Sequence, residues 1–110
     1  MSSKSEYSEY ILDVLSPLGE VSLGRFFGGT SLKCNGKQFC MIMKSSLYFR
    51  VNDINLNAYL EYKADPFSYL TKNGWVYVRS YYEVPAEVID DEAMLLSWAE
   101  LALDAARDKK

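Results

Sequence analysis

Histidine is absent from this chain of 110 residues, and its absence limits the chemistry that the side chains can do. Serine–histidine and cysteine–histidine nucleophile pairs, histidine-ligated zinc and proton transfer by imidazole are all excluded. No other pattern places a nucleophile beside a base, so we expect no enzyme activity and no catalytic residue. We also expect no bound metal and no organic cofactor, because no set of ligands has suitable spacing.

The two cysteines, Cys34 and Cys40, are expected to be buried and reduced. Asn35-Gly36 between them is a strong hairpin signal, because a type I′ turn needs two residues that tolerate positive φ. A two-residue turn there would pair Ser31 with Cys40 and would place the two cysteines on opposite faces of the sheet. Thiols on opposite faces cannot be bridged unless the backbone moves.

An acidic cluster at 87–92 has two interpretations. It could be a site for a hard cation, but the alternating oxygen ligands and central glycine of an EF-hand loop are missing. It could instead be the negatively charged start of a helix, which the helix dipole favours. We expect the second, with Asp90 or Asp91 as the capping residue.

Basic and aromatic residues alternate in the predicted sheet, where the candidate partner-binding residues are Arg50, Arg79, Tyr81 and Tyr82. Exposed aromatic rings beside arginines are typical of surfaces that stack nucleic-acid bases. The alternative is that these rings are buried strand residues that fill the space between sheet and helices. The sequence favours burial and leaves nucleic-acid binding as the second hypothesis.

The charge is distributed unevenly along the chain. Residues 21–82 carry a net charge of +5, whereas residues 1–20 carry −3 and residues 83–110 carry −5. The sheet would therefore be basic and the flanking helices acidic. Either a basic sheet face meets an anionic partner, or sheet and helices neutralise each other within the fold. The overall charge of −3 favours the second.

A second group of candidate partner-binding residues lies at a glycine-rich corner and comprises Arg25, Phe26, Phe27, Gly28 and Gly29. This corner could dock a partner through the arginine and its flanking rings. Alternatively, the glycines could serve only the architecture, with one at positive φ in a bend. The architectural interpretation is favoured, because both glycines fit it without a ligand.

These residues must be positioned by a mixed set of helices and strands. Apolar spacing and turn signals predict helices over 5–15, 53–62 and 91–107, and strands over 21–27, 30–34, 37–43, 47–51, 67–71 and 75–82. Short connections and two Asn-Gly turns favour antiparallel pairing. We therefore predict one α+β domain over residues 1–110, with a mainly antiparallel sheet of five to six strands and terminal helices packed on one face.

The helices carry more specific expectations. Asp53 is the expected N-cap of the short helix, and Ile54, Ala58 and Tyr59 are expected to face inward. In the last helix the inner stripe is expected to comprise Met94, Trp98, Leu101 and Ala105. That stripe could instead face a second copy, so a homodimer stays open. No apolar run is long enough to cross a membrane and no signal peptide is evident, so we expect a cytoplasmic protein.

Several motifs, taken in order, resemble the amino-terminal domain of the TfoX/Sxy competence regulators. The resemblance runs from about Leu15 to Ala106, and its motifs are Arg25-Phe26-Phe27-Gly28-Gly29, Asn35-Gly36, Phe39, Leu47-Tyr48, Asp65-Pro66-Phe67-Ser68-Tyr69, Tyr81-Tyr82-x-x-Pro85, Asp90-Asp91 and Trp98-Ala99.

The resemblance implies a regulatory domain that acts by protein contact and has no catalytic residues. Larger members of the family join this domain to a carboxy-terminal helical domain and promote transcription of DNA-uptake genes together with the cAMP receptor protein. The present chain is expected to be the amino-terminal domain alone. A protein partner in the transcription machinery is therefore expected, and direct nucleic-acid binding is the alternative.

Overall fold

The fold is known from a computed structural model that describes residues 3–26 and 28–107. Its elements, in chain order, are α1 (Ser3–Val14), the short 3-10 helix η1 (Ser16–Leu18), β1 (Val21–Phe26), β2 (Gly29–Cys34), β3 (Lys37–Met43), β4 (Ser46–Arg50), α2 (Leu56–Glu61), β5 (Pro66–Thr71), β6 (Gly74–Glu83), α3 (Ala86–Ile89) and α4 (Glu92–Arg107). The six strands form one antiparallel sheet in the order β1-β2-β3-β4-β6-β5. The predicted α+β class and strand number are confirmed.

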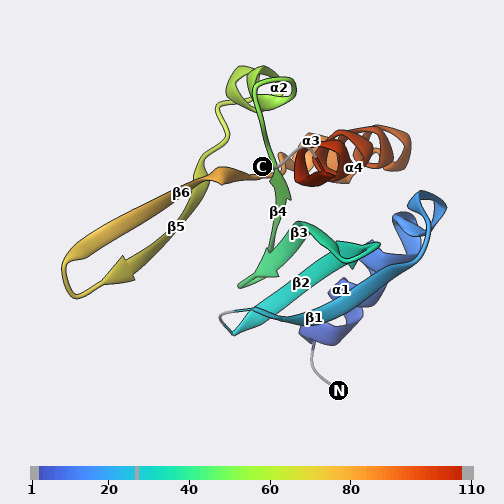
Figure 1. The fold of residues 1–110 in the computed structure, drawn as a ribbon, viewed down its shortest axis with the longest axis horizontal. Helices are drawn as coiled ribbons and strands as arrows, with labels where there is room; N and C mark the ends of the chain where they lie inside the picture. The colour runs from blue at the N-terminus through green and yellow to red at the C-terminus, as the bar shows by residue number, and fades with distance from the viewer. Residues whose placement is uncertain (1–2, 27, 108–110) are drawn as a thin grey trace.

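The main core lies between one face of this sheet and the two long helices. Ile11 and Leu15 of α1, Leu95 and Ala99 of α4, and strand residues such as Phe49 belong to a single buried cluster. Figure 1 shows α4 and α1 set against the sheet, with β5 and β6 extending away from the body. The predicted packing of the terminal helices on one face is confirmed.

The β2–β3 hairpin departs from the predicted register. Cys34 pairs with Lys37, as a two-residue turn requires, but a bulge then places Cys40 opposite Leu32. Phe39 is the extra residue. Because of this bulge, Cys40 joins Cys34 in the main core, so the prediction of opposite faces was wrong. The prediction of two buried cysteines is confirmed, and both are free thiols.

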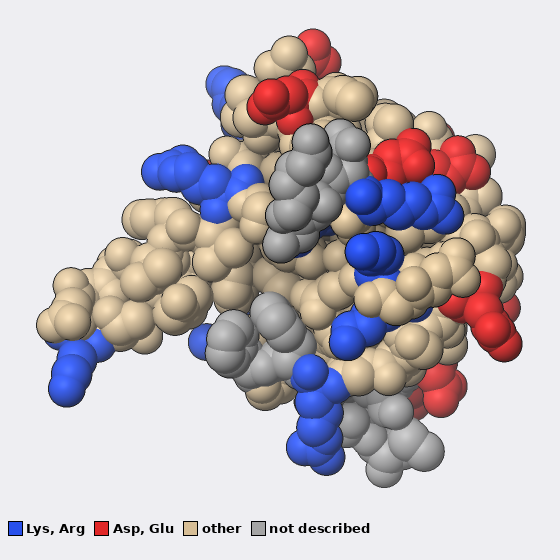
Figure 2. All heavy atoms as spheres, in the orientation of Figure 1, with Lys and Arg blue, Asp and Glu red and all other residues tan. Residues whose placement is uncertain are grey.

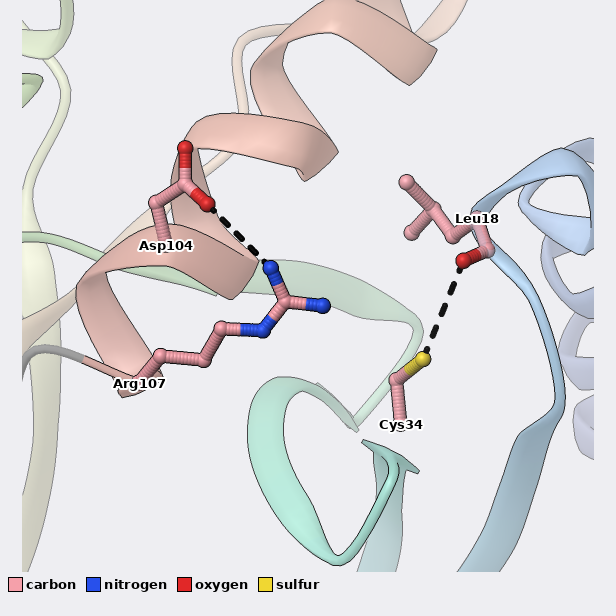
Figure 3. Close-up of polar contacts among 4 residues, drawn as sticks. All are labelled: Leu18, Cys34, Asp104 and Arg107. Atoms are coloured by element: carbon pink, nitrogen blue, oxygen red, sulfur yellow. Dashed lines mark hydrogen bonds and ion pairs between the residues drawn. The ribbon is translucent and has the colours of Figure 1, made fainter.

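Two hydrogen bonds fix the end of η1 and the start of α4. The thiol of Cys34 lies 4.0 Å from the carbonyl oxygen of Leu18, where η1 meets the sheet (Figure 3). At the start of α4, Asp91 accepts a hydrogen bond from the Met94 amide at 3.1 Å, so Asp91 caps the helix as predicted. The ion pair between Asp104 and Arg107 is solvent-exposed and contributes little.

The segment before α2 is built by asparagine side chains and not by Asp53. The buried Asn55 side chain accepts a hydrogen bond from the Asn52 amide at 2.8 Å and donates one to the Arg50 carbonyl at 3.1 Å. The helix consequently begins only at Leu56. Ile54 is 76% exposed, so its predicted inward position was wrong.

The inner stripe of α4 is rotated slightly from the predicted one. Trp98 and Ala105 are buried as expected, and Tyr59 packs edge-on against Trp98 with ring centroids 4.7 Å apart. Leu101 is exposed, contrary to prediction, and Leu103 is buried. The buried side is therefore centred on Leu95, Ala99 and Ala102, which lie beside the predicted stripe.

The opposite face of the sheet, here called the open face, carries a second and smaller cluster. Met41, Phe67 and Tyr81 are buried in it, and Tyr48 and Val78 pack against it. Their strand neighbours Cys40, Phe49 and Tyr82 belong to the main core, as the alternation of side chains along a strand requires. The open face therefore has its own apolar packing, formed by strand residues.

Candidate protein-contact site

Several exposed large apolar side chains of the described residues gather on a projecting hairpin. We call residues 66–79 the arm: it consists of β5, the turn and the first part of β6, up to Arg79. Figure 1 shows it reaching out from the body of the sheet. The register of the arm runs from Phe67 opposite Val78 to Thr71 opposite Gly74, around a two-residue turn. This register fixes which side chains share each face.

Both faces of the arm are apolar. One face carries Tyr69 and Val76, which are opposite each other, and the other carries Leu70, Trp75 and Tyr77. Leu70 is 65% exposed, Trp75 60% and Tyr77 54%. A hairpin in water normally keeps one polar face, because only the other is covered by a core. The composition of the arm therefore indicates that something else covers it.

A cleft of about 620 Å³ lies beside the arm. Met43, Lys44 and Ser46 form one side of it, around the β3–β4 turn, and Tyr48 also lines it. The arm supplies the rest of the lining through Phe67, Ser68, Tyr69, Leu70 and Trp75. This volume is typical of binding sites, and the lining is mainly aromatic and aliphatic.

The base of the cleft is fixed by ring packing on the open face. The rings of Tyr48 and Phe67 meet edge to face, with centroids 5.2 Å apart. Burial raises the pKa of Tyr48, and the nearby Glu83 carboxylate raises it further. Tyr48 therefore stays protonated at neutral pH, and its phenol can donate a hydrogen bond there.

The charged side chains of the arm and of the cleft lining are basic. The arm contains Lys72 and Arg79 and no acidic residue. Among the described residues that line the cleft, Lys44 is the charged one. Figure 2 shows lysine and arginine side chains over the middle of one face and at the tip of the arm, with acidic side chains nearer the upper and right margins.

The predicted partner residues do not form one site. Arg50 places its guanidinium 5.5 Å from the centroid of the Tyr81 ring, and Tyr81 is buried on the open face. The Tyr81 hydroxyl donates a hydrogen bond to the Gln38 carbonyl at 3.2 Å. Burial raises the pKa of Tyr81, while the neighbouring Arg50 lowers it. Tyr82 lies in the main core against Tyr59, with ring centroids 6.1 Å apart.

Of the candidate partner-binding residues, Arg79 is the one that lies in the arm. Its guanidinium lies 5.7 Å from the centroid of the Tyr77 ring, and both side chains are exposed. Sequence reasoning missed the other arm residues because it took strand aromatics to be buried. The signal was available: with Asn73-Gly74 as the turn region, apolar residues fall on both faces of the hairpin.

The glycine-rich corner lies at the β1–β2 turn. Arg25 is exposed there, whereas Phe27 and the side chain of Phe26 lie outside the described residues. Gly28 has a φ of +81°, and a Cβ atom on Gly29 would overlap the Met43 side chain and the Ile42 carbonyl oxygen. Gly28 therefore has the positive φ that the architectural interpretation predicted, and Gly29 lies where a side chain would not fit.

No group of three or more acidic or cysteine side chains is placed to hold a metal ion among residues 3–26 and 28–107. Within the same part of the chain, no helix is long and apolar enough to cross a membrane.

The family model described as the TfoX N-terminal domain matches residues 13–106. No curated protein matches the chain.

Proposed function

The chain belongs to the TfoX N-terminal domain family, and from this premise we propose that it is a regulatory domain that acts by protein contact in the control of DNA uptake. The arm and the cleft beside it are the proposed contact surface. The partner is a protein of the transcription machinery, as the resemblance implies, and the domain works in the cytoplasm without catalysis.

The observation that carries this proposal is the apolar surface of the arm. With about 200 Å² for an aromatic and about 150 Å² for an aliphatic side chain, the exposed parts of Leu70, Trp75 and Tyr77, which share one face of the arm, amount to about 330 Å². The largest apolar patch on a typical monomer is about 300–600 Å² and is often functional. Trp and Tyr are also the residues most enriched at the centres of protein interfaces.

The chemistry of the cleft supports a binding role and not a catalytic one. Its described lining offers hydroxyl groups and one lysine, without a carboxylate that could act as a base toward them. Histidine is missing from the whole sequence, and both cysteines are buried away from the cleft in the main core. An acidic or uncharged partner segment would match the positive charge around the arm.

Nucleic-acid binding is the second candidate, and Arg79 and Tyr77 are the observation that favours it. This exposed arginine–aromatic pair has the composition of a base-stacking surface. Against it, the other predicted pair is used internally, because Arg50 covers the buried Tyr81. Tyr82 is in the core and cannot stack on a base. The arm therefore retains one such pair, which is less than a stacking platform needs.

The proposal is tested by photo-cross-linking in living cells of the native source. Trp75 is replaced by p-benzoylphenylalanine, which reacts with whatever lies against the arm. The matched control carries the same group at Glu100, which is exposed on α4. We expect a cross-link to a second protein from position 75 and none from position 100. Treatment with nuclease should leave this product unchanged.

Two results would contradict the proposal. A product that disappears on nuclease treatment would support the nucleic-acid alternative. Equal products from the two positions, or only adducts of the domain with itself, would show that the arm does not contact a regulatory partner.

A further inference from the structure

A second exposed apolar surface of the described residues lies on α2 and α4. Ile54 before α2, Tyr62 after it and Leu101 of α4 are 76%, 39% and 39% exposed. A spacing of four residues places Ile54, Ala58 and Tyr62 on one side of α2. The rings of Tyr62 and Trp98 meet edge to face with centroids 5.7 Å apart, and Ala58, Trp98 and Leu101 line a shallow hollow. We call these five residues the α2–α4 patch.

The patch is bordered by acidic side chains. Asp53 precedes Ile54 and Glu61 precedes Tyr62, and both carboxylates belong to exposed residues. Residues 53–62 contain no basic residue, and Lys63, which follows them, offsets one of the two charges. The border of the patch is therefore negative, and a surface that covers the patch should be apolar and basic.

The arm is a surface of that kind. Leu70 and Trp75 lie opposite each other, and Tyr77 is two residues further along β6, so the three share one face. The Arg79 guanidinium lies 5.7 Å from the centroid of the Tyr77 ring. Lys72 stands at the turn, two residues after Leu70, and the arm contains no acidic residue. This face of the arm is therefore apolar with a basic border.

The arm and the patch of one chain do not cover each other. Figure 1 shows β5 and β6 leading away from α2. The two surfaces are both apolar and carry opposite charges, so they complement each other. They can meet when they belong to two copies of the chain.

The size of the two surfaces indicates how the copies must meet. The exposed parts of Ile54, Tyr62 and Leu101 amount to about 250 Å², which adds to the about 330 Å² of the arm face. One such contact buries about 580 Å², as little as a crystal-packing contact. Two contacts related by a two-fold axis bury about 1,150 Å², close to the lower limit of specific interfaces. A dimer therefore needs both contacts.

We infer that two copies of this chain associate reciprocally, with the arm of each copy on the α2–α4 patch of the other. The Leu70, Trp75 and Tyr77 face is covered in this dimer, so the regulatory partner and the second copy compete for the arm. The dimer is then the inactive form of the regulatory domain. The inference rests on the proposed function only for this consequence, because the contact between the copies requires no partner.

The first experiment is sedimentation velocity on the purified chain alone. An interface of this size belongs to the small and weak class, so we expect a dimer with a dissociation constant of about 50 µM. Wild type should be mostly monomeric at about 2 µM and mostly dimeric at about 300 µM. A monomer over this whole range would overturn the inference. Species larger than a dimer would do the same, because a contact that does not close grows into chains.

The second experiment reverses the charges of each surface. The arm-reversed variant carries Lys72→Glu and Arg79→Glu, and the patch-reversed variant carries Asp53→Lys and Glu61→Lys. Alone, each variant opposes like charges in both contacts and should dimerise at least tenfold more weakly than wild type. In an equimolar mixture both contacts become attractive, so a heterodimer should form with an affinity within about threefold of the wild-type dimer. A mixture that stays monomeric would overturn the inference.

The matched control is Glu9→Lys, Glu20→Lys, which changes the net charge as the patch-reversed variant does. Both residues are exposed and lie outside the patch. This control should dimerise like wild type, and it should not bind a labelled arm-reversed chain, because its patch is still acidic. Circular dichroism reports the fold of each variant. Equal binding of the arm-reversed chain by the control and by the patch-reversed variant would show that net charge drives association, against the inference.

These outcomes are separable from those of the cross-linking experiment. Glu100 lies about half a helical turn from Trp98, so position 100 points away from the patch and stays a valid control. A chain that dimerises as described but cross-links from position 75 only to itself keeps this inference and loses the proposed regulatory partner. A chain that stays monomeric but cross-links from position 75 to another protein does the reverse.

Discussion

Phe39 is the bulged residue of β3, and it lies opposite no residue of β2. Pairing is regular at Cys34 and Lys33 and resumes where Cys40 lies opposite Leu32. Burial explains the bulge, because it admits both the large ring of Phe39 and the thiol of Cys40 to the main core. The turn residues determine the first pairs of a hairpin. They do not show that a bulge further along the strand will bring an apolar ring into the core.

The environment of Cys40 leads to a prediction about alkaline stability. Burial raises the pKa of its thiol well above the ordinary value of 9.0. Above that pH the unfolded chain loses the thiol proton while the folded chain keeps it. The contribution of this thiol to the free energy of unfolding is thus fully present below pH 9 and is lost as the pH rises. We expect Cys40→Ala to reduce the slope of unfolding free energy between pH 9 and 10 by about 1 kcal/mol per pH unit.

Urea titrations at several pH values measure this slope. The cavity left by the substitution lowers the stability at every pH and does not alter the slope. Identical slopes for Cys40→Ala and wild type would show that the thiol ionises in the folded protein.

At the scale of elements, the order of helices and strands follows from local patterns, whereas the role of the arm does not. The Asn73-Gly74 signal predicted the second hairpin, and apolar periodicity predicted α1 and α4. The arm is exposed because β6 pairs with β4 only from Tyr81 to Glu83, near its carboxy-terminal end. The rest of β6, back to Gly74, extends beyond β4. That length mismatch between strands is a property of the assembled sheet, so a single segment of sequence does not reveal it.

The arm is expected to open at a lower free energy than the rest of the sheet. Amide groups of Tyr69 and Val76 are paired only across the two-stranded ribbon, whereas Cys40 and Phe49 lie in the centre of the sheet. Native-state hydrogen exchange should give the arm amides an opening free energy at least about 2 kcal/mol below that of the central amides. Equal opening free energies would mean that the arm is stabilised within one chain.

At the scale of the whole molecule, the sheet is basic and the flanking helices are acidic. The residues outside 21–82 carry −8 against the +5 of the sheet region, so the far field of the positive face is largely cancelled. At physiological salt the screening length is about 8 Å, and the remaining positive charges act only at close range. Composition alone predicted this balance, but not that the positive charge would border an apolar arm.

Weak binding to DNA is the expected consequence. In a fluorescence titration with labelled duplex and single-stranded DNA, we expect a dissociation constant above about 100 µM at physiological salt, with a shallow salt dependence. Lys44→Glu combined with Arg79→Glu should change little. Micromolar binding with a steep salt slope, lost in that double variant, would support the nucleic-acid function instead. Arg50 is unsuitable for this test, because its side chain packs over the buried Tyr81.

Transcription of a DNA-uptake gene in the native host tests the central claim most directly. The chromosomal copy is replaced by the Leu70→Ser, Trp75→Ser variant, and the control carries Leu23→Ser, an exposed apolar residue on the opposite edge of the sheet. Both variants should accumulate and melt like wild type. We predict that transcription in the arm variant falls to the level of a gene deletion, while the control keeps the wild-type level. Wild-type transcription in the arm variant, or an equal fall in both, would contradict the assignment of the arm as the regulatory contact surface.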